Sequence, residues 1–128
     1  MSSMAKIQIL EQGALPKGAS SPGITRHRAF EGEGLKVLHS HADPDTVSGW
    51  HNHGDYYVYG YVVSGTARFE SGPGGTDAVS AGTGDFFAVP PHTVHREINP
   101  SSTKDQEVIL FLQGTGPTVS NVEGPDPN

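Results

Sequence analysis

The sequence predicts an all-β protein built from short strands joined by tight turns. Its 128 residues include 17 Gly and 10 Pro, which end helices and favour turns. These residues recur so often that no stretch of 12 or more residues keeps the periodicity of an amphipathic helix. Short runs of β-branched and aromatic residues recur instead, which is typical of a β-sandwich or a β-barrel.

Nine such runs are predicted to be strands, because each is bounded by Gly, Pro, Asp or Ser. In chain order they lie at 7–10, 24–30, 35–41, 56–63, 67–71, 77–79, 85–89, 94–98 and 108–112. Residues 71–76 have the Gly- and Pro-rich composition of a hairpin connection. We expect one domain over residues 1–128, with a core at about 24–114 and extended N- and C-terminal segments.

The composition argues against several classes of partner and of chemistry. A net charge of −6 with only 8 Lys and Arg, and no basic run, argues against nucleic acid and against a membrane surface. The chain has no Cys, which excludes disulfides and thiolate ligands. No apolar run approaches the ~18 residues of a membrane span, and the first residues lack the apolar region of a secretory signal. We therefore expect a cytoplasmic protein.

Histidines are the main candidates for function, since six of the seven lie between positions 39 and 95. His51 and His53 form a His-x-His pair, and on an extended segment alternate side chains point to the same side. His95 can add a third nitrogen when the chain folds back on itself. Neutral imidazole is the commonest metal ligand, and an all-nitrogen set suits zinc, iron, copper or nickel better than magnesium or calcium. The sequence therefore predicts a metal site inside a β-barrel.

The same alternation predicts which other side chains face the interior. If the strand continues without a bulge from His53, its inward face includes Tyr57, Tyr59 and Tyr61. These tyrosines are expected either to line a pocket for a flat substrate or to form plain core. Lys36 occupies one face of the run at 35–41, so the face that carries His39 and His41 is the expected interior one, where both would serve as structural residues or line the pocket.

The spacing of these residues resembles the two motifs of the cupin superfamily. The first motif has a His-x-His pair followed by a glutamate and a glycine, and residues 51–65 are similar to it. The second motif is matched by Gly84, Pro90, His95 and Asn99. The resemblance covers residues 49–99. It implies a small jelly-roll β-barrel with a divalent metal ion held by His51, His53 and His95, and pairing of the chains as a homodimer.

Two positions depart from the cupin pattern. Tyr57 and Val58 stand where the first motif has its glutamate, and alternation favours Tyr57 as the residue at that place. His92 stands where the second motif has a glycine in its tight turn. This histidine is expected either at the mouth of the barrel, beside the substrate pocket, or as a surface turn residue. Arg96 and Glu97 are interpreted as a solvated pair or a sheet-edge pair.

A site without a carboxylate has consequences for chemistry. Three neutral imidazoles leave a divalent ion with a local charge of about +2, against about +1 with one carboxylate added, which favours an anionic bidentate ligand. The resemblance then implies an Fe(II)-dependent dioxygenase acting on a small anionic, phenolic or keto compound. Tyr57 would donate a hydrogen bond to this substrate or, as a phenolate, bind the metal.

Two other functional classes remain open from the sequence. A Zn, Ni or Mn ion on the same ligands would suit an isomerase, a lyase or a hydrolase, because it can activate water or polarise a carbonyl group. A barrel of this kind can also be a non-catalytic sensor or binding module for a small molecule, with or without a metal.

Overall fold

The computed structural model describes residues 5–18 and 23–125, and these residues form almost only β-structure. The helical turns among them are two 3-10 turns, η1 (Gln12–Ala14) and η2 (Pro73–Gly75). The strands are β1 (Ile24–Gly32), β2 (Leu35–Ala42), β3 (His51–Asn52), β4 (Tyr57–Ser64), β5 (Thr66–Ser71), β6 (Asp77–Gly82), β7 (Phe86–Val89), β8 (His95–Ile98), β9 (Gln106–Gln113) and β10 (Ser120–Asn121).

The all-β prediction is therefore confirmed, with local differences. The strand predicted at 7–10 does not form, and Ile7 in this stretch is 94% exposed. Residues 1–4, 19–22 and 126–128 of the predicted terminal segments lie outside the described residues. Within the described ranges we find no helix with the length and hydropathy that a membrane crossing requires.

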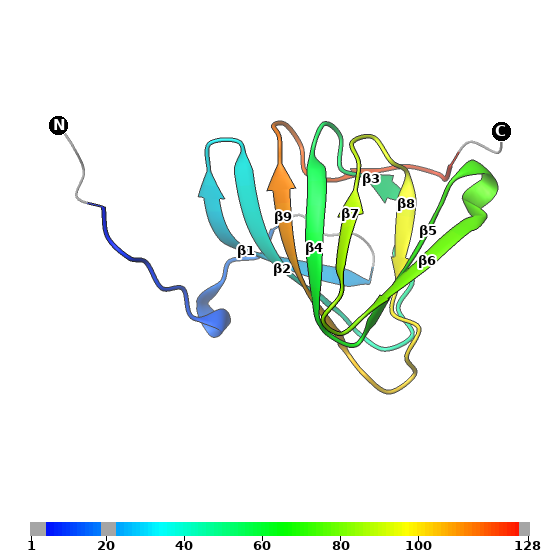
Figure 1. Cartoon of the computed structure of the whole chain (residues 1–128), viewed down its shortest axis with the longest axis horizontal. Coiled ribbons are helices and arrows are strands. Elements are labelled where there is room, and N and C mark those ends of the chain that lie inside the picture. The colour runs from blue at the N-terminus through cyan, green and yellow to red at the C-terminus, as the bar shows by residue number, and fades with distance from the viewer. Residues whose placement is uncertain (1–4, 19–22, 126–128) are drawn as a thin grey trace.

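The strands form two antiparallel five-stranded sheets that face each other (Figure 1). Sheet A has the order β1-β2-β9-β4-β7, and sheet B has the order β10-β3-β8-β5-β6. Most neighbours are not consecutive in sequence, so the chain crosses repeatedly between the sheets, as in the expected jelly roll. β5 and β6 are a hairpin with η2 at its tip, which confirms the connection predicted at 71–76.

Alternate side chains of the central strands form the core between the sheets. On β9, Val108, Leu110 and Leu112 are buried, whereas the intervening residues are half-buried or exposed. They belong to one cluster with Val58 of β4 and Phe69 of β5. Burying one such Val, Leu or Phe side chain stabilises the fold by roughly 1.5–3 kcal/mol. This packing holds sheet A against sheet B and so fixes the positions of β3 and β8.

The inward orientation expected for Tyr57, Tyr59 and Tyr61 is wrong. The buried residues of β4 have the opposite parity, and Tyr59 is 45% exposed. The strand is interrupted after His53 by a turn in which Gly54 has a φ of 57°. The Tyr56 amide closes this turn on the His53 carbonyl at 3.1 Å. Buried positions therefore change from odd numbers at His53 to even numbers on β4, since one shifted residue reverses every later side chain.

The face of β2 was also assigned wrongly. Leu38, Ser40 and Ala42 are buried, while His39 and His41 lie half-buried on the outer face of sheet A. Lys36 shares the parity of the inner face but lies near the start of the strand, where its ammonium group reaches Glu31 at 3.5 Å. A long side chain at a barrel end can keep its charge in solvent, so Lys36 was a poor marker of the outer face.

Candidate metal centre

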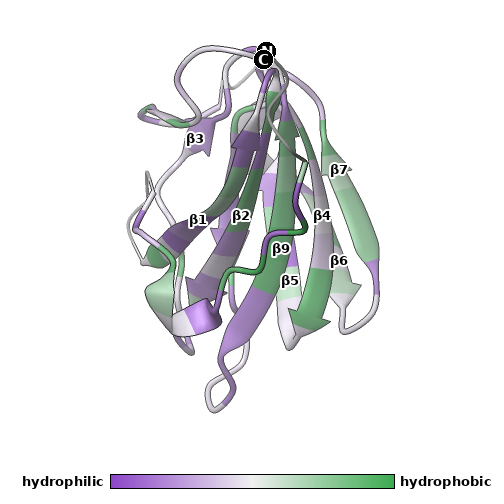
Figure 2. Ribbon diagram, turned by 90° about the vertical axis from the view of Figure 1, so that its left-hand side faces the viewer, coloured by the Kyte–Doolittle hydropathy of each residue, from purple (hydrophilic) through white to green (hydrophobic). Residues whose placement is uncertain are grey.

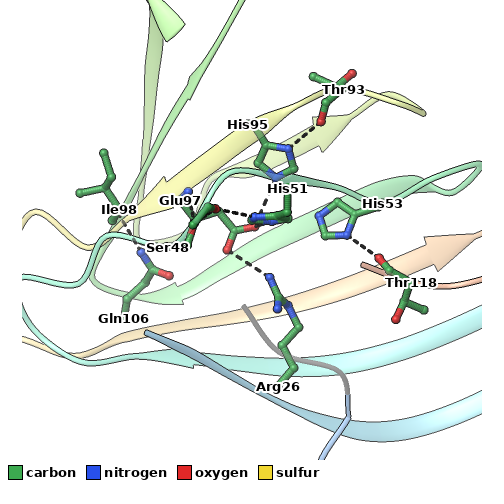
Figure 3. A network of polar contacts seen from close by, with 11 residues as sticks. Arg26, Ser48, His51, His53, Thr93, His95, Glu97, Ile98, Gln106 and Thr118 are labelled. Carbon is green, nitrogen blue, oxygen red and sulfur yellow. Dashed lines mark hydrogen bonds and ion pairs between the residues drawn. The ribbon is translucent and has the colours of Figure 1, made fainter. Parts of the chain in front are cut away.

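Three histidines and one glutamate converge on the inner face of sheet B (Figure 3). His51 on β3 is the register partner of His95 on β8, His53 follows β3, and Glu97 lies two residues after His95. One donor atom from each of the four residues lies within 4.8 Å of the others, and all four side chains are buried. The structure thus brings together the three histidines named from the sequence.

Backbone carbonyl groups orient all three imidazole rings. Nδ1 of His51 lies 2.9 Å from the Gly49 oxygen, Nδ1 of His53 lies 2.8 Å from the Thr118 oxygen, and Nδ1 of His95 lies 2.9 Å from the Thr93 oxygen. A carbonyl oxygen only accepts, so each neutral ring carries its proton on Nδ1 and a lone pair on Nε2. Nε2 of His51 and of His95 is buried without a hydrogen-bond partner. Metal-binding histidines typically have this arrangement, in which a hydrogen bond from one ring nitrogen fixes the tautomer and the orientation of the ring.

The C-terminal segment supports the centre, which the sequence did not indicate. It supplies the Thr118 carbonyl to His53, and its strand β10 pairs with β3. The Tyr56 hydroxyl donates to the Gly116 carbonyl at 2.9 Å and so ties the same segment to the turn after His53. No residue pattern in this segment distinguishes it from an ordinary tail.

Glu97 corrects the prediction of a site without a carboxylate. Instead of forming a solvated pair with Arg96, this glutamate is 8% exposed, and its Oε1 lies 3.6 Å from His51 Nε2 and 3.5 Å from His95 Nε2. Its amide donates to Ser48 Oγ at 2.8 Å, which holds this part of β8 in place. The glutamate missing from the first motif is thus replaced by one from the second. The two-residue spacing from His95 was the available signal.

Arg96, the neighbour of Glu97, points to the other side of the sheet. Its Nε donates to Glu70 Oε1 at 2.6 Å, and its guanidinium carbon lies 4.6 Å from the centre of the Trp50 ring. The two residues therefore separate by the ordinary alternation of a strand: Arg96 joins a surface network, and Glu97 joins the interior.

Arg26 adds a positive charge to the buried site, and the sequence reading missed it. This β1 residue is 1% exposed, and its Nη2 lies 3.7 Å from Glu97 Oε2. A divalent ion, one carboxylate and one guanidinium would together carry a charge of about +2. This is the charge that was expected for a site without a carboxylate, and the expectation of an anionic ligand stays a prediction. Alternation from Ile24 would have placed Arg26 inside.

The ionisation states suit metal binding at neutral pH. Burial lowers the pKa of His53 to about 4, although the charge of Glu97 opposes the shift, so this ring is neutral. Burial also acts to raise the pKa of Glu97. The neighbouring His51, His95 and Arg26 outweigh it and hold this pKa well below its usual range. The site therefore presents a neutral His53 imidazole and an ionised Glu97 carboxylate.

The remaining residues predicted to line the substrate pocket lie elsewhere. Tyr57 and Tyr59 stack on each other with ring centres 4.7 Å apart, on the outer side of sheet A. Tyr61 contacts Phe86 there, and His39 and His41 are on the same outer face. This placement gives no support to a catalytic role for Tyr57.

His92 occupies an exposed turn outside the four-residue cluster. Its φ of 58° lies in the left-handed region that favours glycine, in agreement with the glycine that the motif has at this position. The amide donates to the Gly54 carbonyl at 2.9 Å, and Nε2 lies 2.7 Å from Asp55 Oδ1. The His92 side chain is 68% exposed, so this residue is a surface turn residue, the second of the two possibilities.

A cavity of about 130 Å³ reaches His95 from the side where β7 faces β5 and β6. Its walls are mainly apolar and include Phe69, Phe87 and Val89, with Ser71 and Thr93 as polar members. The space inside the barrel near Glu97 is almost completely filled by side chains. A substrate that reaches the centre through this cavity must therefore be small.

The donor set fits a divalent transition metal. Three imidazole nitrogens and one carboxylate oxygen are ligands that zinc, iron, nickel and manganese accept. Nε2 of His51 and of His95 is buried without a hydrogen bond, which is costly, and a metal ion bound to these atoms would remove that cost. His51, His53, His95 and Glu97 can thus hold a divalent ion.

These features define a small jelly-roll barrel with a buried histidine–carboxylate centre, and the comparisons agree. The family model described as "Cupin domain" matches residues 38–112. The chain belongs to this cupin family. No match was found among the curated proteins.

Solved structures share the fold at low sequence identity. KdgF from Halomonas sp. is 23% identical with a TM-score of 0.69, covering 85% of this chain and 96% of that one. The polyketide cyclase RemF from Streptomyces resistomycificus is 14% identical with a TM-score of 0.74, covering 91% and 86%. An oxalate oxidase is 15% identical with a TM-score of 0.69, covering 90% and 63%.

Proposed function

We propose that this cupin is an Fe(II)-dependent dioxygenase that acts on a small anionic or keto compound. The observation that carries the proposal is the set of four converging donors, His51, His53, His95 and Glu97. Four protein ligands fill the coordination of a tetrahedral zinc ion but leave two positions open on a six-coordinate ion such as iron. Two open positions can accept one donor atom of the substrate and one O₂ molecule, which is what a reaction between the two requires.

The ion would supply the one-electron chemistry by which O₂ reacts with an organic molecule. A dioxygenase adds both oxygen atoms to its substrate, so one substrate molecule and one O₂ balance the reaction without a separate reductant. The protein's part is to hold three rings by their Nδ1 protons and to keep Glu97 ionised. These fixed groups need no rearrangement during the reaction.

The surroundings of the centre support a substrate with an anionic end and an apolar body. Arg26 raises the positive charge near Glu97, which favours an anion. Phe69 and Phe87, with ring centres 4.6 Å apart, are among the apolar walls of the cavity that reaches His95, and they limit the water in it. One structural neighbour is an oxalate oxidase, but at 15% identity this likeness extends to the fold alone.

The test starts with metal content, measured by elemental analysis on protein purified without added metal or chelator. The expected result is close to one iron per chain in the wild type and almost none in His95→Ala. His92→Ala is the matched control, because this exposed histidine lies outside the centre and its variant should keep the iron.

Activity is then measured as O₂ consumption by the iron-loaded protein with a panel of small keto acids, diketones, phenols and dicarboxylates. We expect at least one compound to consume O₂ at one molecule per substrate, only with Fe(II), and not with His53→Ala. Turnover that continues without O₂, or with a redox-inactive ion, would replace the proposal with a zinc, nickel or manganese isomerase, lyase or hydrolase. Ligand-dependent thermal shifts without any turnover would indicate a binding module.

A further inference from the structure

A second group of histidines and carboxylates lies on the outer face of sheet A, where no role has been assigned to it. His39 and His41 are two residues apart on β2, and Glu107 on β9 is the register partner of His41. Asp43 and Asp105 follow β2 and precede β9 in the adjoining loops. Figure 2 shows hydrophilic stretches on β2 and β9 in strands that are otherwise largely hydrophobic. We call these five residues the outer cluster.

Direct contacts connect the donor atoms of the outer cluster. Nε2 of His41 lies 3.0 Å from Asp105 Oδ2 and 3.8 Å from Glu107 Oε1. The other oxygen of Glu107 contacts Nε2 of His39. One carboxylate thus bridges the two histidines, and both rings present the same nitrogen to the carboxylates. Asp43 lies on the other side of the His41 ring, with Oδ1 3.8 Å from Nδ1.

A buried asparagine holds the two loops of the outer cluster together. Asn99 is fully buried, and its Nδ2 lies within hydrogen-bond distance of the carbonyls of Ala42, Asp43 and Lys104 at 3.3, 3.1 and 2.8 Å. These carbonyls belong to the segments that carry Asp43 and Asp105. The amide of Asp45 also donates to the Ser101 carbonyl at 2.9 Å. The positions of the two aspartates are therefore set by the fold, as a binding site requires.

The charges of the outer cluster call for a cation. The three carboxylates would carry three negative charges, and in the part of the chain that the structure describes their ion pairs are all with histidines. Even a protonated His41 would balance only one of these charges, whereas a divalent cation would balance two. His39, His41 and Glu107 also line a groove of about 520 Å³ between sheet A and the η1 turn, so an ion can reach them from solvent.

We propose that His39, His41, Asp105 and Glu107 form a second divalent-cation site on the outer face of sheet A, separate from the centre inside the barrel. Two imidazole nitrogens and two carboxylate oxygens are a mixed set that suits zinc and disfavours calcium or magnesium. Donor atoms of His41, Asp43 and Asp105 lie within 4.8 Å of one another, so Asp43 can serve as a further ligand. The bound ion joins β2, β9 and the loop after β8, so it stabilises this edge of the barrel and takes no part in the reaction.

The test counts metal ions by equilibrium dialysis against micromolar zinc chloride followed by elemental analysis for all metals. The wild type is expected to hold two divalent ions per chain. His41→Gln and Glu107→Gln should each lose one of them and keep the barrel ion, whereas His53→Ala should lose the barrel ion and keep the outer one. His27→Ala is the matched control, because His27 lines the same groove without contacting the carboxylates, and its variant should keep both ions.

Two results would overturn the proposal. One is a wild type that holds a single ion per chain, or outer variants that hold as many ions as the wild type. The other is the loss of both ions from His41→Gln and Glu107→Gln while their circular dichroism spectra and melting curves without metal match the wild type, since the two sites would then not be separate. The proposed dioxygenase activity is not affected by either result.

Discussion

The inner face of sheet B and the outer face of sheet A carry the same residue types in opposite states. His53, inside, is 3% exposed, and burial lowers its pKa to about 4. His41, outside, is half-buried, and its hydrogen bond with Asp105 raises its pKa above the ordinary value. Inside, backbone carbonyls fix the rings, and Nε2 of His51 and His95 lies 3.6 and 3.5 Å from Glu97 without a hydrogen bond. Outside, Nε2 of His41 lies 3.0 Å from Asp105, and Nε2 of His39 contacts Glu107.

The comparison teaches that burial, more than residue type, prepares a metal site. Inside, a neutral His53 and an ionised Glu97 are the states that a metal requires, and all four donor side chains are buried. A cation at the outer cluster must replace histidine–carboxylate contacts that are open to solvent, so we expect it to bind more weakly than the inner ion.

The largest effect is predicted for removing the negative charge of Glu97 from the inner site. Replacing Glu97 with glutamine leaves Arg26 with less compensation in the interior, so the free energy of unfolding of the metal-free protein should fall by about 3–5 kcal/mol. Urea unfolding in the presence of a chelator measures this. The double variant Arg26→Met/Glu97→Leu should recover most of the loss, and a Glu97→Gln effect below about 1 kcal/mol would contradict a buried pair.

The second prediction compares neighbouring residues on the two faces of β9. Leu110→Ala removes a 3% exposed core side chain and should cost about 2–5 kcal/mol of unfolding free energy. Phe111→Ala, on the outer face with 40% exposure, should cost roughly 1 kcal/mol or less. Thermal or urea unfolding of both variants measures these losses of unfolding free energy. Equal losses for the two variants would mean that the outer face is covered by a second chain or another partner.

The third prediction concerns a carboxylate on the outer side of sheet B. Hydrogen bonding with Arg96 lowers the pKa of Glu70, which is partly exposed. A lowered pKa contributes stability above the ordinary pKa near 4.5, and this contribution is lost as the pH falls through the lower value of the folded state. Glu70→Gln should therefore be less stable than the wild type at pH 7 by under about 1 kcal/mol. The difference should shrink in acid, and a difference that grows there would contradict the assignment.

The smallest effect is expected at Tyr57. Because this ring stacks on Tyr59 on the outer side of sheet A, Tyr57→Phe should leave the iron content and the O₂ consumption of the loaded protein unchanged. A large loss of activity with unchanged metal content would return Tyr57 to the active site and contradict its placement on β4.

Much of the site was predictable because metal ligands leave a local pattern. The His-x-His pair and the distant His95 identified three of the four donors, and the breakers with the short β-branched runs predicted the all-β class. Glu97 was within reach of the same reasoning, because alternation from His95 places it on the inner face. It was missed because a charged residue beside Arg96 was taken to be solvated.

Two errors concerned which side chains of a strand face the interior. One came from extending the alternation of side chains through a turn, and the other from using a single lysine to identify the outer face. The turn at Gly54 shifted the parity of β4 and reversed the positions of Tyr57, Tyr59 and Tyr61. Lys36, near the start of its strand, misled the assignment of β2. Neither the parity after a turn nor the solvent access of a strand end is encoded in a short window of residues.

The sequence by itself determined the fold class, the family motifs and three converging histidines, because these depend on local spacing and on residue type. Only the tertiary structure decided that Glu97 completes the centre, that Arg26 lies beside it and that the Thr118 carbonyl orients His53. It also decided that His39 and His41 meet Asp105 and Glu107 outside the barrel. These contacts join strands far apart in the chain, and such pairing is set by how two sheets pack their whole cores together.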